Sequence, residues 1–255
     1  MGAMSRETVQ QEVREWLQDN WDPQLSLQAW REHLVDAGWA VPSWSHKWFG
    51  RDLPAWADQV VAEELRLIGA VGNPLGSGMS LAAPTIVEHG SDELKRLILR
   101  QTLTGEKTWC QLFSEPGAGS DLASLSTSAV LDGDEWVING QKVWTTLAHR
   151  AQWCFVVART EAGSTGHKGL SYLLVPMDQP GVEIRPLRQM TGSAEFNEVY
   201  FSDARTSADL VLGEVGDGWA VAMATLGFER GTAFMSQQLA FQRELREIIE
   251  VAQSN

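Results

Sequence analysis

The chain has 255 residues, of which 44% are hydrophobic, and its formal net charge is −13. This length and composition are sufficient for two modest domains or one large one with a substantial core. The acidic excess argues against nonspecific binding to nucleic acid or anionic lipid, because such binding comes mainly from Lys and Arg neutralising phosphates. Any phosphate-bearing ligand must therefore be held locally, by particular residues.

The composition also bears on location, metals and redox chemistry. No apolar stretch approaches the roughly 20 residues needed to cross a bilayer, and the start lacks the charged-then-apolar order of a secretion signal. We therefore expect a cytoplasmic protein without a membrane span. The five histidines lack metal-ligand spacing, so no metal site is predicted. Cys110 and Cys154 lie in apolar, strand-like runs and are expected to be buried thiols rather than a disulfide framework.

The segment from Val9 to about Arg100 has the apolar period of α-helices. Apolar residues recur at helical spacing in three stretches, and Ser26 is placed to cap the second of them. These stretches contain Val9, Val13, Trp16 and Leu17; Trp30, Leu34 and Ala37; and Val61, Leu65 and Ile68. The sequence therefore predicts a helical layer.

From about Trp109 onward the pattern changes to alternation with β-branched residues, which favours short strands. The predicted strands cover 125–131, 136–138, 141–145, 153–158, 170–175, 182–185 and 198–201. Asp132-Gly133 and Asn139-Gly140 are typical of tight hairpin turns that need a positive φ. Short strands joined by such turns predict a barrel or a sandwich.

Helical character returns at Gly218, and the last apolar stripe consists of Leu245, Ile248, Ile249 and Ala252. One amphipathic helix cannot bury its own face, so we expect that another subunit covers this stripe or that the chain is cut short. The order of elements predicts an α+β protein in three parts. These are an N-terminal α-helical domain (5–105), a middle β-barrel or sandwich domain (106–215) and the incomplete start of a C-terminal helical bundle (216–255).

The stretch from Phe113 to Asp121, Phe-Ser-Glu-Pro-Gly-Ala-Gly-Ser-Asp, is the most informative motif. Its glycines allow backbone amides to approach a ligand closely, and the hydroxyls of Ser114 and Ser120 can donate hydrogen bonds. The motif is neither a dinucleotide-binding G-x-G-x-x-G nor a Walker loop. By spacing alone, a turn between a strand and a loop explains it equally well.

These residues resemble the Glu-Pro-Gly-Ala-Gly-Ser-Asp signature of the acyl-CoA dehydrogenase family. The stretch 138–146 resembles the family's second signature, and 38–42 and 89–96 lie where its N-terminal domain has similar sequences. The resemblance covers nearly all of the chain. It implies the family's N-terminal helical and middle β domains, followed by the start of its C-terminal helical domain.

The resemblance also implies an FAD site. The stretch 111–120 matches the loop that holds the isoalloxazine and the pyrophosphate of FAD, with Ser114 at a position whose hydroxyl contacts the flavin. Trp144 matches an indole that covers one flavin face, and Thr146 a hydroxyl that hydrogen-bonds near N5. Gln111 departs from the aromatic or aliphatic residue that well-known members often have. The candidate cofactor-binding residues are Gln111, Phe113, Ser114, Gly119, Ser120, Trp144, Thr145 and Thr146.

The implied reaction oxidises an acyl-CoA thioester to its trans-2-enoyl form. A base removes the α proton while a hydride leaves the β carbon for flavin N5. Family members place this Glu late in the C-terminal domain or in the first helix of that domain. Glu229 matches the second position and is the candidate catalytic base, although a solvated pair with Arg230 explains the same residues. Ser120 and Arg230 are the candidate substrate-binding residues.

Two other interpretations remain open from the sequence. One is an acyl-CoA oxidase or flavin monooxygenase on the same scaffold, and the other is a non-catalytic or truncated subunit of a flavoenzyme complex. The partners that the resemblance implies are acyl-CoA, an electron-transfer flavoprotein as acceptor, and further subunits of a homo- or hetero-oligomer. Branched, long-chain and steroid-side-chain thioesters all remain possible substrates.

Overall fold

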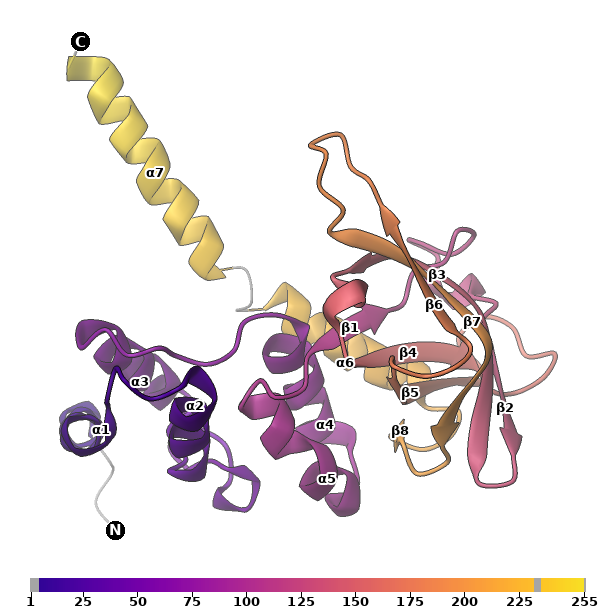
Figure 1. The fold of residues 1–255 in the computed structure, drawn as a ribbon, viewed down its shortest axis with the longest axis horizontal. Helices are drawn as coiled ribbons and strands as arrows, with labels where there is room; N and C mark the ends of the chain where they lie inside the picture. Colours follow the sequence, from indigo (N-terminus) through magenta and orange to yellow (C-terminus); the bar gives the residue numbers. More distant parts are fainter. Residues whose placement is uncertain (1–4, 232–234, 255) are drawn as a thin grey trace.

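Helices form the N-terminal part of the chain in the computed structural model, which describes residues 5–231 and 235–254. Figure 1 shows them on one side of the molecule, with the strands on the other. A π-helical turn, η2, runs directly into α4. The elements are α1 (Arg6–Asn20), α2 (Leu27–Asp36), η1 (His46–Trp48), α3 (Trp56–Leu67), η2 (Gly78–Ala82), α4 (Ala83–His89) and α5 (Asp92–Leu103).

The predicted helical layer is confirmed, and its helices begin where the sequence provides caps. The side chain of Ser26 accepts a hydrogen bond from the amide of Ala29, as its position before α2 predicted. The predicted apolar positions of α1, α2 and α3 are buried, except that Trp16 and Ala37 are half-buried and Ile68 is exposed. Glu64 on α3 is also buried, and it accepts hydrogen bonds from Arg14 and Gln10 of α1. This pairing fixes α3 against α1.

The middle of the chain forms one eight-stranded sheet with the order β6-β7-β3-β2-β4-β5-β8, in which β1 pairs with β4. The path begins at β6 and ends at β8, so the sheet is sandwich-like and is not a closed barrel. Cys110 and Cys154 face each other in β1 and β4 as buried free thiols. The strands are β1 (Trp109–Leu112), β2 (Ser128–Asp132), β3 (Glu135–Thr146), β4 (Trp153–Arg159), β5 (Leu170–Pro176), β6 (Val182–Leu187), β7 (Phe196–Ser207) and β8 (Val211–Leu212).

One predicted turn is confirmed and the other is wrong. Gly133 has φ 67° and lies in the hairpin between β2 and β3, as expected. Asn139-Gly140 instead lies inside β3, where the pairing with β7 changes register between Ile138 and Gly140. The extra residue is on β7: Asp203 has φ 56°, and Asn139 exchanges two 2.9 Å hydrogen bonds with it. The dipeptide therefore supports a bulge in a long strand rather than a hairpin.

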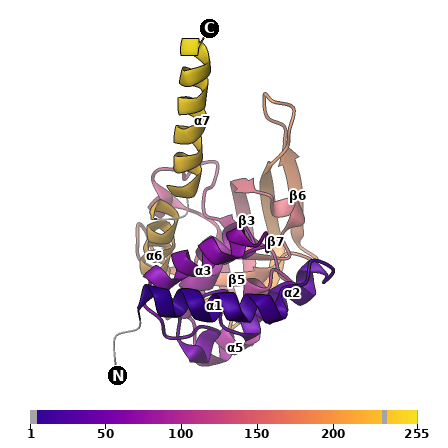
Figure 2. The ribbon, with the colours of Figure 1, turned by 90° about the vertical axis from the view of Figure 1, so that its left-hand side faces the viewer.

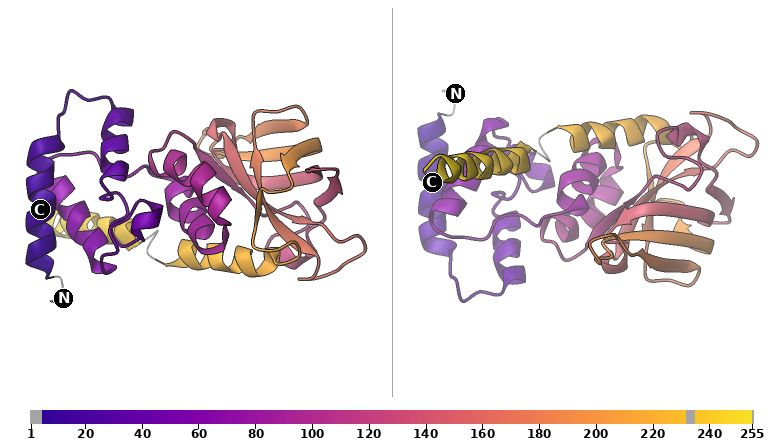
Figure 3. Two further views of the ribbon diagram at one scale, coloured as in Figure 1. Left: turned by 90° about the horizontal axis from the view of Figure 1, so that it is seen from below. Right: turned by 90° about the horizontal axis from the view of Figure 1, so that it is seen from above.

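Helix α6 (Gly218–Arg230) joins the helical layer to the sheet. The hydroxyl of Thr225 lies 3.0 Å from that of Thr85 on α4 and 3.1 Å from that of Tyr172 on β5. All three side chains are buried. Thr85 and Thr225 also donate to the carbonyls of Leu81 and Val221, whereas the hydroxyl of Tyr172 has Thr225 as its one hydrogen-bond partner among the described residues. Figure 3 shows α6 running alongside both parts. The network holds α6 in a fixed position across the boundary.

Helix α7 (Met235–Ser254) projects away from the rest of the molecule (Figure 2). Its predicted apolar stripe of Leu245, Ile248, Ile249 and Ala252 is exposed, and so is Phe241. That this face has a partner stays a prediction. Within the part of the chain that the structure describes, no helix is both long and apolar enough to cross a membrane.

Candidate active site

The loop after β1 is a tight turn that is fixed by backbone and side-chain hydrogen bonds. Glu115 and Ala118 exchange backbone hydrogen bonds of 2.9 and 3.0 Å, which folds Pro116 and Gly117 into the turn. The side chain of Glu115 then accepts hydrogen bonds from both backbone amides of Ser126 and Thr127, at 2.7 and 2.9 Å. The segment from Phe113 to Asp121 thus has a conformation fixed by its own carboxylate.

Lys142 binds this carboxylate from β3. Its ammonium donates to Glu115 Oε1 at 2.9 Å and to the carbonyl oxygens of Phe113 and Val157 at 3.1 and 2.9 Å, which uses all three protons. Both side chains are buried. Burial opposes the charge on Glu115, but the charge of Lys142 and the hydrogen bonds outweigh it and lower the pKa of Glu115 to about 2. Burial lowers the pKa of Lys142 to about 8, although Glu115 opposes this shift.

A bulge in β3 turns Trp144 out of the sheet. The register against β7 changes between Lys142 and Thr145, and Trp144 has φ 62°, a conformation that costs energy for a residue with a side chain. Its indole is 63% exposed and meets the ring of Phe196 edge-on. The amide of Val143 donates to the carbonyl of Ser114 at 2.9 Å, so the bulge and the loop are joined directly.

Most of the candidate cofactor residues line one cavity of about 480 Å³, which we call the loop cavity. It lies between the loop, the β3 bulge and one face of α6. Its walls include the predicted residues Gln111, Phe113, Ser114, Gly119, Ser120, Trp144, Thr146, Glu229 and Arg230. Thr145 is the one candidate that does not line it: its side chain is buried, and within the described chain its hydroxyl has no hydrogen-bond partner.

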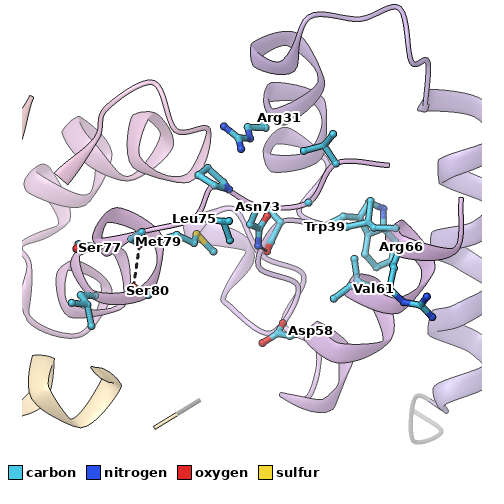
Figure 4. Close-up of a pocket in the computed structure, with 18 of the residues that line it drawn as sticks. Arg31, Trp39, Asp58, Val61, Arg66, Asn73, Leu75, Ser77, Met79 and Ser80 are labelled. Atoms are coloured by element: carbon cyan, nitrogen blue, oxygen red, sulfur yellow. Dashed lines mark hydrogen bonds between the residues drawn. The ribbon is translucent and has the colours of Figure 1, made fainter. Parts of the chain in front are cut away.

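A second cavity of about 990 Å³, the large cavity, opens toward the N-terminal helices (Figure 4). Most of its wall comes from α2, α3 and the segment 70–81, and more than half of the lining residues are apolar or glycine. The polar and charged ones are Arg31, Asp58, Arg66, Asn73, Ser77, Ser80, Gln111, Thr146 and Glu229. Glu229, Gln111 and Thr146 line both this cavity and the loop cavity. Glu229 therefore lies at the junction of the two cavities.

The sequence reasoning missed two kinds of residue. Glu115 and Lys142 lie inside the two signatures, but we did not predict that they form a buried pair. A lysine in an otherwise alternating apolar strand was the available signal. The α6 residues Trp219, Met223 and Leu226 also line the loop cavity. Their spacing places them on one helical face, but the sequence did not indicate what that face contacts.

Comparisons with known proteins follow the same division of the chain. Residues 1–106 match the family profile described as the N-terminal domain of acyl-CoA dehydrogenase, and residues 110–204 match the profile of its middle domain. A protein of Mycobacterium tuberculosis called acyl-CoA dehydrogenase IpdE1 is 48% identical over 96% of this chain and 68% of its own length. The IpdE1 of Mycolicibacterium smegmatis is 47% identical over 94% of this chain and 68% of its own.

Solved structures agree in fold. A structure described as the Tcur3481-Tcur3483 steroid ACAD matches with a TM-score of 0.74 and 26% identity, covering 98% of this chain and 67% of that one. The ChsE4-ChsE5 complex from Mycobacterium tuberculosis matches with a TM-score of 0.66 and 29% identity, covering 89% of this chain and 61% of that one. A sandwich-like sheet joined to helices, with two signatures around one cavity, is the arrangement that this chain shares with those structures. The chain belongs to the acyl-CoA dehydrogenase family.

Members of this family typically bind FAD, and the loop cavity fits such a group. No hydrogen bond among the described residues uses the amides of Gly119 or Ser120, so both remain free for an acceptor on a ligand. A Cβ at Gly117 or Gly119 would meet nothing within 4 Å, which is the open space that a close-lying ligand needs. The exposed indole of Trp144 offers an aromatic face beside them.

Proposed function

We propose that this chain is the FAD-binding and substrate-oxidising part of an acyl-CoA dehydrogenase, which converts an acyl-CoA thioester to its trans-2-enoyl form. The observation that carries the proposal is that Glu229, Gln111 and Thr146 line both the large cavity and the loop cavity. Bound FAD would accept the β hydride at its N5. The large cavity suits the acyl group, because apolar side chains that include Trp39, Val61 and Leu65 form much of its wall.

The chain's own residues have separable roles in this proposal. Glu229 removes the α proton of the thioester, and Arg230 and Ser120 bind the substrate. Ser114, Ser120 and the free amides of Gly119 and Ser120 hold the polar parts of the cofactor. Trp144 covers one face of its ring system, and Gln111, Phe113, Thr145 and Thr146 complete the binding set, with the side chain of Thr145 supporting the bulge from beneath.

The test is an anaerobic titration of the FAD-reconstituted protein with acyl-CoA thioesters, following flavin absorbance. The panel contains linear, branched and steroid-derived acyl groups, because a relative is described as a steroid ACAD. We expect wild type to lose absorbance and Glu229→Gln to lose it at least about 100-fold more slowly, since a positioned base contributes roughly 10²–10⁴ in rate. Exposed Glu214 provides the matched control Glu214→Gln, which keeps the wild-type rate.

The same experiment separates the alternatives. Equal bleaching by wild type and Glu229→Gln would contradict the assignment of the base. Failure of the protein to retain FAD would favour a non-catalytic or truncated subunit. If the reduced flavin reoxidises rapidly in air with peroxide formation, the protein is an oxidase or monooxygenase rather than a dehydrogenase.

We further propose an electron-transfer flavoprotein as the electron acceptor and a homo- or hetero-oligomer as the working form. The exposed apolar stripe of α7 supports the second proposal, because its burial needs other helices. The domain boundaries at residues 105/106 and 215/216 and a cytoplasmic location stay predictions.

A further inference from the structure

A third cavity of about 300 Å³ lies behind Thr146, and we call it the basic cavity. Its walls come from the segment 74–79, the end of α5, the start of β1 and the turn after β3. The apolar part of the wall consists of Pro74, Leu75, Met79, Trp109 and Leu147. Its charged side chains are Arg31, Lys107 and Arg150.

The charge of this cavity is opposite to that of the whole chain. The protein has 33 acidic and 20 basic residues, yet no Asp or Glu occurs among the described residues that line the basic cavity. Arg31, Lys107 and Arg150 also take part in none of the ion pairs formed within 5–231 and 235–254. The charged part of the wall is therefore entirely cationic, with Arg31 and Lys107 half-buried and Arg150 exposed to solvent.

Arg31 forms no hydrogen bond or ion pair through its side chain with the described residues. A Cβ at Gly105 would lie 3.0 Å from a guanidinium nitrogen of Arg31 and 2.8 Å from the ring of Pro74, so both side chains approach Gly105 closely. In Figure 4 the guanidinium of Arg31 points away from Trp39 and Arg66. Its Nε is buried without a hydrogen-bond partner among the described residues, and burial lowers the pKa of the guanidinium. A buried donor left in this state needs an acceptor that a ligand can supply.

Hydrogen bonds connect the backbone segments that contain Lys107 and Arg150. The hydroxyl of Thr108 donates to the carbonyl of Arg150 at 2.8 Å, and the amide of Lys107 donates to the carbonyl of Gln101 at 3.0 Å. The amides of Gln152 and Trp153 both donate to the carbonyl of Thr108 at 3.0 Å. These bonds fix the start of β1 against the turn that follows Thr146.

The basic cavity adjoins the large cavity along one segment. Both are lined by Arg31, by Thr146 and by residues 74–77 and 79. Thr146 also lines the loop cavity, so it lies where all three spaces meet. A chain that begins beside Glu229 and Thr146 can therefore continue past apolar side chains and end among the three cations.

We infer that the basic cavity binds a carboxylate at the far end of the acyl group, so that the preferred substrates are thioesters of dicarboxylic acids. This inference rests on the proposed function. A carboxylate matches the planar donor pair of an Arg guanidinium, and the apolar wall of the cavity suits the methylene groups that precede it. An inorganic phosphate would leave that wall without a partner.

The test compares binding of two acyl-CoA series to the FAD-reconstituted full chain by calorimetry. One series has a terminal methyl group and the other a terminal carboxylate, with matched chain lengths that include octanoyl-CoA and suberyl-CoA. We expect at least one length at which the carboxylate form binds roughly tenfold more tightly or better, because a desolvated charge pair is involved. Arg31→Met and Lys107→Met should each remove most of that preference. Lys107 does not line the large cavity, so Lys107→Met should leave the Kd of the methyl series unchanged.

The controls separate failure of this inference from failure of the proposed function. Lys168→Met removes an exposed cation elsewhere and should leave the preference unchanged. Suberate and inorganic phosphate are titrated alone, so the anion site is tested even if no thioester reduces the flavin. Equal affinity for the two series at every length, or a preference that survives in the Arg31→Met/Lys107→Met double variant, overturns the inference. The inference is also overturned if phosphate binds more tightly than suberate and Arg31→Met abolishes that phosphate binding.

Discussion

Lys142 Nζ lies 2.9 Å from Glu115 Oε1, and this buried ion pair joins the two segments that carry most of the candidate cofactor residues. Glu115 belongs to the loop after β1, and Lys142 precedes the bulge that exposes Trp144. Neither side chain lines any of the three cavities. We therefore interpret the pair as the support of the site rather than as part of its chemistry.

Removal of one partner should be strongly destabilising. Lys142→Met leaves a buried carboxylate without its cation, so we expect the free energy of unfolding to fall by about 3–5 kcal/mol, measured by urea titration. The double variant Lys142→Met/Glu115→Gln should lose less than the sum of the two single changes. Lys168→Met is the matched exposed control. A loss below about 1 kcal/mol in Lys142→Met would show that the buried ion pair contributes little to the stability of the fold.

The lowered pKa of Glu115 predicts that the protein loses stability in acid. The pKa of Glu115 is lowered from its ordinary 4.5 to about 2, so its contribution is complete above pH 4.5 and is lost as the pH falls toward 2. The lowered pKa corresponds to about 3 kcal/mol. We expect the wild-type unfolding free energy to fall more steeply with acid than that of Glu115→Gln, which lacks the titrating group. If the unfolding free energies of the two proteins fall in parallel between pH 6 and pH 3, the pKa of Glu115 is not lowered in the folded state.

Thr225 should matter for the attachment of α6. Thr225→Val keeps the shape of the side chain but deprives the buried hydroxyl of Tyr172 of its partner, so we expect a loss of about 1–3 kcal/mol. Thr225→Ser retains the hydroxyl and should lose less. Hydrogen exchange of α6 amides measures the effect locally, and unchanged exchange in Thr225→Val would argue against the network as the attachment.

Replacement of Trp144 should weaken the binding of FAD without a large change in the stability of the fold. Trp144→Gly relieves the positive φ but loses the contact with Phe196, and these effects nearly offset each other, so we expect the unfolding free energy to stay within about 1 kcal/mol of wild type. The affinity for FAD should fall, because the aromatic face is gone. Trp144→Phe keeps a ring and should retain more flavin. Full FAD affinity in Trp144→Gly would show that the indole does not contact the cofactor.

The sequence was sufficient for features that depend on local spacing. The apolar period located the helices that contain Val13, Leu34 and Val61, and Gly133 marked a true hairpin. Asn139-Gly140 was read wrongly because its partner, Asp203, lies 64 residues away, and dipeptide preferences do not contain that information. Whether the sheet closes into a barrel depends in the same way on strands distant in sequence.

The candidate site was only partly predictable for the same reason. The signatures located the residues of the loop cavity, since a resemblance carries positions over one by one. The basic cavity was not foreseen, because Arg31, Lys107 and Arg150 come from three separate segments and each alone is an ordinary surface cation. Only folding shows that these three cations share one small space without acidic partners.

The hydrogen bond between Thr85 and Thr225 spans 140 residues, and this has a consequence for synthesis on the ribosome. The helical layer and the sheet are complete in the chain before α6 emerges, but Glu229 and the α6 wall of the loop cavity are not yet present. The nascent chain therefore displays an open loop after β1 while translation continues at roughly 5–20 residues per second. The loop cavity is complete only after α6 has left the ribosome, and an interruption before that point leaves the apolar surface that α6 covers exposed to chaperones.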